Sequence, residues 1–484
     1  MQSRIPRVLP YPVARSNAVV ASKPWLTITT LIVGDLLTLT ALMAATVWGR
    51  YVLGGVYEFQ TYWQLWPTLF LFVAVYALLG LYPAVGLSVP EEIRRVFTAT
   101  TLVYLLLGST TFLFKEAETY SRAIFLVAWA LSLAGVPIAR ALLRHWFAAK
   151  PWWGYPVVIL GAGKTGEAVV KALRRQPGLG LKPVAFLDDD PSKRGDFVGV
   201  LVLGGLELAP KIAQEWGIRH AVLAIPGASR ARLLEVIERY GSAFPKLTLI
   251  PDLFGMASLW VSATDMGGIL GLDLRHNLLQ PSARWLKRGL DLVGVLMGGL
   301  LLLPFLGLLA LLIRLDSPGP VIFAHERLGK DGRRFRALKF RTMVQNADQV
   351  LCKALEQNPA LKAEWERDHK LRRDPRITRV GVWLRRTSLD ELPQLWNVLA
   401  GEMSLVGPRP IVQAEVERYG DRFSLYAQVL PGMTGLWQVS GRNDTTYTER
   451  VTLDTYYVRN WSPWLDFYLL ARTVWAVLWS KGAY

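Results

Sequence analysis

Two adjacent carboxylates, Asp390 and Glu391, stand in a stretch whose residue types suit phosphate chemistry. Arg385 precedes them, and a Gly-Pro-Arg-Pro loop at residues 407–410 follows. Adjacent carboxylates repel each other unless a cation lies beside them, and Mg²⁺ is the natural candidate where no His or Cys cluster exists. An ionised carboxylate can also act as a nucleophile. The pair therefore indicates a nucleophile, a Mg²⁺ site, or both.

A structural role for this pair is the main alternative. Ser388 and Glu391 have the spacing of a helix capping box, with Trp396 in the buried stripe of the helix that follows. Pro393 weakens this interpretation because proline prefers the first helical position, so the pair can instead lie just before the helix start. In either register the acids lie near the positive end of a helix and close to arginines. We therefore expect lowered carboxylate pKa values and ionised side chains.

Basic and loop-forming residues surround the pair in the sequence. The stretch 325–343 is basic and amphipathic, and each Lys or Arg beside a membrane gains about 1 kcal/mol from anionic lipid and can also bind phosphate. The loops at 401–412 and 429–447 are rich in Gly, Pro, Arg and Asn, which can hold phosphates and a nucleotide. The candidate substrate-binding residues are Lys339, Arg341, Arg385, Pro408, Arg409, Arg442 and Asn443.

Composition indicates a membrane protein with several domains. The chain has 484 residues, of which 52% are hydrophobic, and it carries a formal charge of +17. At roughly 150 residues per domain, this length predicts about three domains. The single cysteine, Cys352, excludes an intrachain disulfide framework, and five scattered histidines disfavour a multi-His metal site. The charge indicates anionic partners, among which we expect lipids and phosphorylated substrates and no nucleic acid.

Four apolar runs at about 25–48, 62–83, 95–114 and 122–143 predict a four-helix transmembrane domain over 25–146, after an N-terminal arm at 1–24. The basic flanks place both ends of this bundle in the cytoplasm. Asp35 lies inside the first run, and we find no second ionisable residue in the other runs to relay protons or ions. A helix-packing carboxyl is therefore expected there.

Residues 150–255 are typical of a Rossmann-like parallel α/β domain. A strand-like run precedes a glycine loop with Gly161, Gly163 and Gly166, and a second strand ends near Asp188. The Tyr-x-x-x-Lys pair of sugar-nucleotide dehydratases is missing. Because the glycines also serve a tight turn and helix packing, we favour a structural role over a bound nucleotide, and we expect a connector at 256–280.

A fifth apolar segment, 289–314, is long enough to cross a membrane. Basic residues flank it on both sides, which a crossing would not favour. Pro304 lies mid-segment, where proline removes a backbone donor and bends a helix. The pattern predicts a re-entrant helix-break-helix that enters and leaves by the cytoplasmic leaflet.

From residue 281 to 484 the chain resembles the bacterial monotopic phosphoglycosyl transferases. Leu303-Pro304 departs from the Ser-Pro often found at this hairpin in the family. "SGRNDTTY" and the terminal "KGAY" are similar to undecaprenyl-phosphate galactose phosphotransferases. The motifs that carry the wider resemblance are Lys287-Arg288-x-x-Asp291, Lys339-Phe-Arg341-Thr-Met, Asp374-Pro-Arg376-Ile-Thr, Ser388-Leu-Asp-Glu-Leu, Gly407-Pro-Arg-Pro, Pro431-Gly-Met-Thr-Gly, Gly441-Arg-Asn and Tyr456-Tyr-Val.

This resemblance implies transfer of a hexose 1-phosphate, galactose first, from a UDP-sugar to undecaprenyl phosphate with release of UMP. Asp390 would be the nucleophile that forms a phosphosugar-aspartyl intermediate, and Glu391 with Asp390 would hold Mg²⁺. The implied location is the bacterial inner membrane, multi-pass, with the site on the cytoplasmic face, and we expect a homodimer. The alternatives are another UDP-hexose, a nucleotide-sugar enzyme that acts through the middle domain, and a non-catalytic scaffold for polysaccharide assembly.

Overall fold

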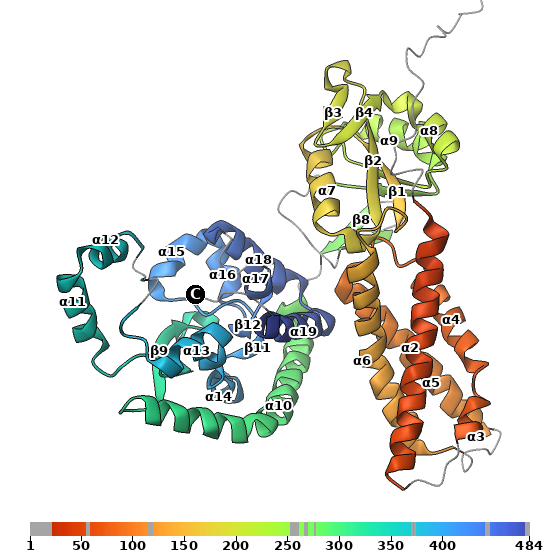
Figure 1. Ribbon diagram of the computed structural model, residues 1–484. Coiled ribbons are helices and arrows are strands. Elements are labelled where there is room, and N and C mark those ends of the chain that lie inside the picture. Colours follow the sequence, from red (N-terminus) through yellow and green to blue (C-terminus); the bar gives the residue numbers. More distant parts are fainter. Residues whose placement is uncertain are drawn as a thin grey trace, which may run out of the picture. The chain divides into compact units, whose positions relative to one another are not determined.

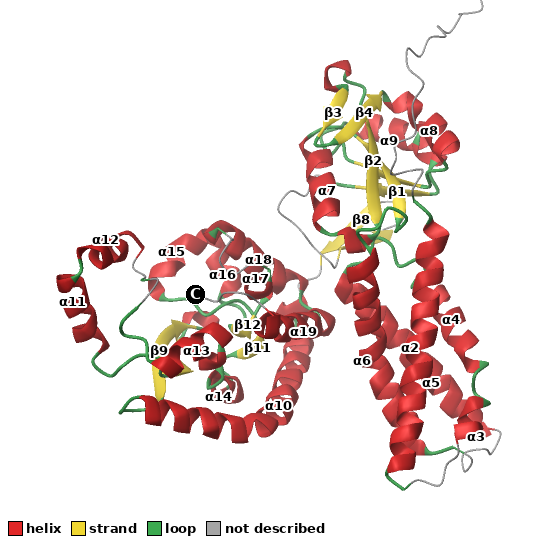
Figure 2. Cartoon of the chain, in the orientation of Figure 1, coloured by secondary structure: helices red, strands yellow, loops and turns green. Residues whose placement is uncertain are grey.

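The computed structural model describes residues 22–54, 59–113, 120–251, 261–265, 270–274, 277–368, 371, 374–440 and 446–479. The chain divides into two compact units, Met1–Phe254 and Gly255–Tyr484. Helices dominate both units (Figure 2). The expected connector at 256–280 contains an antiparallel hairpin of β7 (Val261–Asp265) and β8 (Leu270–Leu274).

Helices of the first unit correspond to the four apolar runs (Figure 1). Helix α2 packs on α6, α6 packs on α5, and α5 packs on α4. Among the described residues, α2, α6 and the later α10 (Pro281–Asp316) are long and apolar enough to cross a membrane, whereas the second run yields only a short apolar helix, α4. The helices are α2 (Pro24–Val52), α3 (Phe59–Trp63), α4 (Thr68–Leu78), α5 (Val89–Leu113) and α6 (Arg122–Phe147).

Asp35 of α2 is the expected helix-packing carboxyl, but it pairs with Arg140 of the fourth apolar run, which corrects the statement that the other runs contain no second ionisable residue. The Arg140 side chain of α6 is 1% exposed, and its Nη2 lies 2.6 Å from Asp35 Oδ2. Arg140 Nη1 also lies 2.9 Å from Glu92 Oε1, and the Tyr82 hydroxyl donates to Asp35 at 2.6 Å. The sequence pattern assigned Arg140 to a basic flank, but α6 continues past it. Because a buried charge is stable only when it is paired, this cluster ties α2, α5 and α6 together.

The middle domain is a six-stranded sheet in the order β3-β4-β2-β1-β5-β6, with helices on its faces (Figure 2). All neighbouring strands are parallel except β3, which is antiparallel to β4. The predicted parallel α/β sheet is therefore present. Its elements are β1 (Tyr155–Leu160), α7 (Lys164–Arg175), β2 (Leu181–Leu187), β3 (Gly195–Phe197), β4 (Val200–Gly204), α8 (Ala209–Trp216), β5 (His220–Leu223), α9 (Arg230–Arg239) and β6 (Lys246–Leu249).

The glycine loop between β1 and α7 shows what each glycine contributes. Gly161 has φ +110°, and a Cβ there would lie 2.7 Å from the Ala224 carbonyl oxygen. A Cβ on Gly166 would collide with the Gly161 carbonyl oxygen. Gly163 has open space instead, with no atom within 4 Å of an added Cβ. Gly161 and Gly166 are thus required by turn geometry and packing, whereas packing does not require Gly163.

The second unit contains two small sheets among its helices. One is the antiparallel pair β9 and β10, and the other is the parallel pair β11 and β12. The other elements of this unit in the list below are helices (Figure 1). The elements are α10 (Pro281–Asp316), β9 (Ile322–Leu328), β10 (Arg334–Phe340), α11 (Ala347–Gln357), α12 (Pro359–Asp368), α13 (Arg379–Thr387), α14 (Gln394–Ala400), β11 (Ser404–Val406), α15 (Val416–Tyr419), α16 (Phe423–Tyr426), β12 (Gly432–Thr434), α17 (Leu436–Val439), α18 (Tyr447–Asn460) and α19 (Pro463–Trp479).

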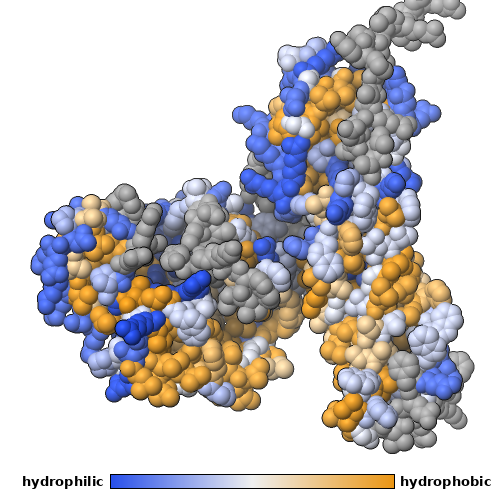
Figure 3. All heavy atoms as spheres, in the orientation of Figure 1, coloured by the Kyte–Doolittle hydropathy of each residue, from blue (hydrophilic) through white to orange (hydrophobic). Residues whose placement is uncertain are grey.

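Helix α10 bends without breaking, which corrects the expected helix-break-helix. It is one helix of 36 residues with Pro304 inside it, and it changes direction sharply part-way along (Figure 1). Val295 in its first arm packs with Val398, and Ile313 in its second arm packs with Leu384. Apolar side chains gather along the rest of α10 at the surface (Figure 3). Both arms therefore rest on the same globular unit and leave an apolar face uncovered.

Candidate active site

The carboxylate pair sits in a short turn between two helices. Helix α13 ends at Thr387, Ser388 adopts a left-handed conformation with φ +56°, and one 3₁₀ turn, Leu389–Glu391, carries both acids. The Ser388 side chain does not cap this turn, so the capping-box alternative is wrong. Pro393 is the N-cap of α14, which places the acids just before that helix.

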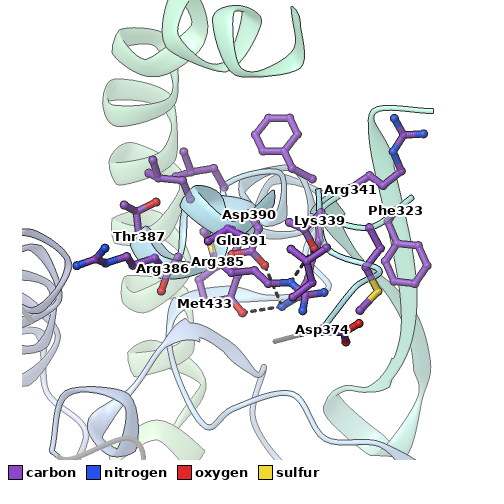
Figure 4. Close-up of a pocket in the computed structure, with 18 of the residues that line it drawn as sticks. Phe323, Lys339, Arg341, Asp374, Arg385, Arg386, Thr387, Asp390, Glu391 and Met433 are labelled. Carbon is purple, nitrogen blue, oxygen red and sulfur yellow. Dashed lines mark hydrogen bonds and ion pairs between the residues drawn. The ribbon is translucent and has the colours of Figure 1, made fainter. Parts of the chain in front are cut away.

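Leucines on either side of the acids fix the turn. Leu389 and Leu392 pack against a buried cluster that includes Phe340 of β10 and Leu384 of α13. Trp396, expected in the buried stripe of α14, is instead 67% exposed. The turn is thus held by apolar packing at its base, with the carboxylates directed toward the surrounding pocket (Figure 4).

Lys339, near the end of β10, supplies a cation beside both acids. Its Nζ lies 2.7 Å from Glu391 Oε1 and 3.8 Å from Asp390 Oδ2. Arg385 of α13 adds a second positive charge near Asp390, and its Nε donates to Thr342 Oγ1 at 2.8 Å. The adjacent charges of the two carboxylates are therefore offset by side chains that come from two different elements.

Burial raises the pKa of Asp390, and the neighbouring Glu391 charge adds to this, whereas Lys339 and Arg385 oppose it. The Asp390 side chain is 14% exposed. The expectation of a lowered pKa is therefore wrong, because desolvation outweighs the nearby cations. A carboxylate stripped of water is also a stronger nucleophile once it is ionised, so burial favours reactivity above the pKa.

The acid limb of the pH–activity profile is expected to report this carboxylate. Activity that needs ionised Asp390 is lost as pH falls through its raised pKa, so the limb lies above the range of a free aspartate. The Lys339 charge lowers that pKa, so Lys339→Met is predicted to move the limb of log kcat/KM to higher pH. Lys353→Met, on exposed α11, is the matched control. A limb that stays in place or moves to lower pH in Lys339→Met contradicts this assignment.

A pocket of about 2210 Å³ contains the pair. Lys339, Arg385, Asp390 and Glu391 line its charged part. Its apolar lining includes Leu302 and Phe305 of α10, Phe323 of β9, and Leu470 and Val474 of α19. One cavity therefore contains both cations and carboxylates that can bind a phosphorylated group. The same cavity has an apolar wall, part of which comes from α10.

Arg341 and Arg409, both predicted to contact phosphate, differ in their contacts within the protein. Arg341 is 8% exposed and donates from Nη1 to the Pro318 carbonyl oxygen at 2.8 Å and from Nη2 to the Ser317 carbonyl oxygen at 2.6 Å. Arg341 thus fixes the segment after α10. Arg409 also lines the pocket, where its guanidinium lies 5.1 Å from the centre of the Trp437 ring. It donates no side-chain hydrogen bond to any residue that the structure describes.

Backbone contacts hold the loop that carries Arg409. The Gly432 amide donates to the Pro408 carbonyl oxygen at 2.8 Å, and the Gly407 amide donates to the Thr434 carbonyl oxygen at 2.8 Å. Pro408 therefore helps to position the loop. Arg442 and Asn443 lie outside the described residues.

Sequence reasoning about the site itself missed Asp374 and Arg376, which line the same pocket. Arg376 Nη2 lies 2.6 Å from Asp374 Oδ2, and its guanidinium lies 5.1 Å from the Trp365 ring centre. Their Asp-Pro-Arg motif was recognised only as part of the family pattern. Because the two side chains neutralise each other, we assign this ion pair a structural role at the edge of the pocket.

Two carboxylates alone suit a Mg²⁺ ion that arrives with a phosphorylated substrate. Within the described part of the chain, no three His, Cys, Asp or Glu side chains are close enough to form a metal site. Mg²⁺ commonly uses one or two protein carboxylates together with substrate phosphates and water. Asp390 and Glu391 fit that pattern, since both carboxylates line the open pocket.

Comparison with known proteins places this site in a family. A family model described as bacterial sugar transferase matches residues 282–480. A UDP-galactose-lipid carrier transferase from Erwinia amylovora is 40% identical over 81% of this chain and 82% of its own length. The chain belongs to the bacterial sugar transferase family. It is also 37% identical to an undecaprenyl-phosphate galactose phosphotransferase from Salmonella typhimurium, over 81% of this chain and 82% of that protein.

The similarity of this sugar transferase extends upstream of the matched domain. A UDP-glucose:undecaprenyl-phosphate glucose-1-phosphate transferase from Escherichia coli is 34% identical over 75% of this chain and 76% of its own length. A second family model, described as CoA-binding domain, matches residues 77–251 and so includes the α/β sheet. The sugar transferase thus combines the matched family domain with apolar helices and an α/β domain in one chain.

Proposed function

We propose that this sugar transferase moves a hexose 1-phosphate, galactose 1-phosphate first, from a UDP-sugar to undecaprenyl phosphate. The observation that carries the proposal is the composition of the large pocket. It places the largely buried Asp390 carboxylate, 14% exposed, beside Lys339 and Arg385, and its wall includes Leu302 and Phe305 of the apolar helix α10. A polar sugar nucleotide and a lipid phosphate can therefore reach the same carboxylate.

In the proposed first step an Asp390 carboxylate oxygen attacks the β-phosphorus of the UDP-sugar. A bond forms between that oxygen and phosphorus, and the bond from phosphorus to the bridging oxygen breaks, so that UMP leaves. In the second step a phosphate oxygen of undecaprenyl phosphate attacks the same phosphorus. The aspartyl–phosphorus bond then breaks, which gives the lipid-linked diphosphate sugar and restores the Asp390 carboxylate.

The neighbouring residues stabilise charge during both steps. Lys339, 3.8 Å from Asp390 Oδ2, and Arg385 lie where oxygens of the transferring phosphoryl group would gather. Arg409, stacked on Trp437, would bind the leaving nucleotide phosphate. A Mg²⁺ ion held by Glu391 and Asp390 would supply further positive charge to the diphosphate oxygens.

The structure of α10 supports a re-entrant membrane anchor. A straight helix of 36 residues would extend about 54 Å and carry its second end across the bilayer. Instead both arms pack on the same unit, and residues such as Leu301, Leu308 and Leu315 remain exposed along α10. We infer that α10 dips into the cytoplasmic leaflet of the inner membrane, while the first four apolar segments cross it.

Cysteine labelling tests this topology. In a Cys352→Ser background, cysteines at Arg284 and at Asp331 are each expected to react with a membrane-impermeant thiol reagent only from the cytoplasmic side. A cysteine at Gly54, between the first and second apolar segments, is the control for the opposite side. Labelling at position 331 from the periplasmic side would show that α10 crosses the membrane.

The reaction itself is tested with a panel of UDP-sugars. Purified full-length protein is incubated with undecaprenyl phosphate and UDP-galactose, UDP-glucose or another UDP-hexose while UMP release is followed. We expect the fastest release with UDP-galactose, because the relatives named for galactose share higher identity with this chain than the Escherichia coli relative named for glucose. Release of UMP from no sugar nucleotide would favour a non-catalytic scaffold.

A further inference from the structure

A second pocket, of about 670 Å³, lies inside the helical bundle of the first unit. Its lining includes Met43 and Val47 of α2, Phe72 of α4, Tyr104 of α5 and Phe125 of α6. Pockets of roughly 300–1,000 Å³ with mainly apolar and aromatic walls are typical ligand sites. None of the residues with a role in the proposed transferase reaction lines this pocket.

The pocket lies where the second apolar segment is irregular. Helix α4 has 11 residues, which extend about 16 Å, or roughly half of a bilayer core. Among the described residues 59–67, the 5-residue α3 and turns precede α4. In these turns the Leu65 amide donates to the Tyr62 carbonyl oxygen, and the Trp66 amide donates to the Trp63 carbonyl oxygen. Non-helical backbone at membrane depth occurs where it lines a cavity or is buried in protein. Leu65 and Trp66 line this pocket.

We place the mouth of the pocket at the α3 end of the bundle, because Trp63 and Trp66 line the pocket there and are exposed. The α3 end is opposite the end that joins the α/β domain (Figure 1), and the basic flanks place that joined end in the cytoplasm. Trp48, Trp63 and Trp66 are exposed around the α3 end. Exposed tryptophans of this kind gather where membrane meets water, so lipids of the outer leaflet can reach the mouth.

Arg122 is the one charged side chain among the described residues that line this pocket. It is exposed, and it forms no ion pair or side-chain hydrogen bond with any residue in the described ranges. Arg122 is also the first residue of α6, where the helix dipole disfavours a cation. An anion bound there would be stabilised both by the guanidinium and by the helix end.

We propose that this pocket binds one anionic phospholipid of the outer leaflet, with an acyl chain inside the bundle and the phosphate on Arg122. An apolar cavity offers water too few polar partners, and an empty one forfeits dispersion contacts along its walls. A hydrocarbon chain restores those contacts and replaces the part of the second span that α4 does not cover. The lipid thereby stabilises the bundle.

Native mass spectrometry of the full-length protein, titrated with phosphatidylglycerol or phosphatidylcholine, tests the headgroup contact. One retained phosphatidylglycerol per chain is expected. Arg122→Gln should weaken its retention about fivefold, the value of one cation–lipid phosphate contact, and should leave phosphatidylcholine unchanged. Arg50→Gln is the matched control, because Arg50 is an exposed arginine in the last turn of α2 that does not line the pocket. Equal retention in Arg122→Gln and Arg50→Gln overturns the headgroup assignment.

Filling the cavity tests the chain contact. Ala44 lines the pocket, whereas Ala45 is exposed on the same helix and does not. Ala44→Phe should abolish the single retained lipid at concentrations where Ala45→Phe retains it, with far-ultraviolet circular dichroism showing that both variants are folded. Equal retention by the two variants overturns the proposal. Stronger retention of polyprenyl phosphate than of phosphatidylglycerol, with the same dependence on Ala44 and Arg122, overturns the choice of lipid.

Discussion

Asp390→Asn is expected to lower sugar-phosphate transfer by at least about 10⁴-fold, as removal of a covalent nucleophile does in other enzymes. The amide keeps the size of the side chain but cannot form the bond to phosphorus. Rates of UMP release with undecaprenyl phosphate as acceptor measure the effect. The structure also predicts an intact fold, because Leu389 and Leu392 hold the turn through packing that does not involve the carboxylate.

A surface carboxylate provides the control for this substitution. Glu326→Gln removes an exposed acid that pairs with Arg334 on the β9–β10 hairpin, and it should leave the rate within about twofold, as exposed ion pairs contribute little. Glu391→Gln is expected to fall between the two variants, since Glu391 touches Lys339 without attacking phosphorus. Near-normal turnover in Asp390→Asn would remove Asp390 from its proposed role.

Chelation of divalent cations should have the second largest effect. EDTA is expected to lower transfer at least about 10³-fold, because a metal ion contributes several kcal/mol to charge stabilisation in phosphoryl transfer. Added Mg²⁺ should restore the rate. Glu391→Gln should raise the Mg²⁺ concentration needed for half-maximal activity, whereas Glu326→Gln should not.

Undiminished turnover in EDTA would contradict the assignment of Mg²⁺ to the carboxylate pair. Lys339, 2.7 Å from Glu391 Oε1, already places one cation at the pair. Undiminished turnover in EDTA would mean that Lys339 and the neighbouring arginines provide all the positive charge that the reaction needs. Glu391 would then serve to orient Lys339 rather than to hold Mg²⁺.

Local residue patterns were sufficient to predict much of the fold. The strand, glycine loop and helix after residue 155 follow from hydrophobic spacing and turn residues, and the structure has them there. The adjacent acids with nearby basic residues indicated a phosphate site, and the structure places Lys339 and Arg385 beside Asp390. These features depend on neighbours in sequence or on a short repeat, which a single sequence displays directly.

The errors involve contacts between segments that are distant in sequence. The pKa of Asp390 depends on burial by residues from other elements, so the helix dipole and neighbouring arginines gave the wrong direction. Arg140 was assigned to a basic flank because its partner Asp35 lies 105 positions away. Arg341 looked like a free phosphate ligand because its bonds to the Ser317 and Pro318 carbonyl oxygens are invisible in the sequence.

Trapping of the covalent intermediate tests the central claim most directly. Full-length protein is mixed with UDP-galactose labelled at the β-phosphate, without a lipid acceptor, then acid-quenched and digested for mass spectrometry. The account predicts one labelled phosphohexose per active site, attached to the Asp390 side chain and discharged by undecaprenyl phosphate. Label that is absent from Asp390 while UMP is released at the normal rate would contradict it.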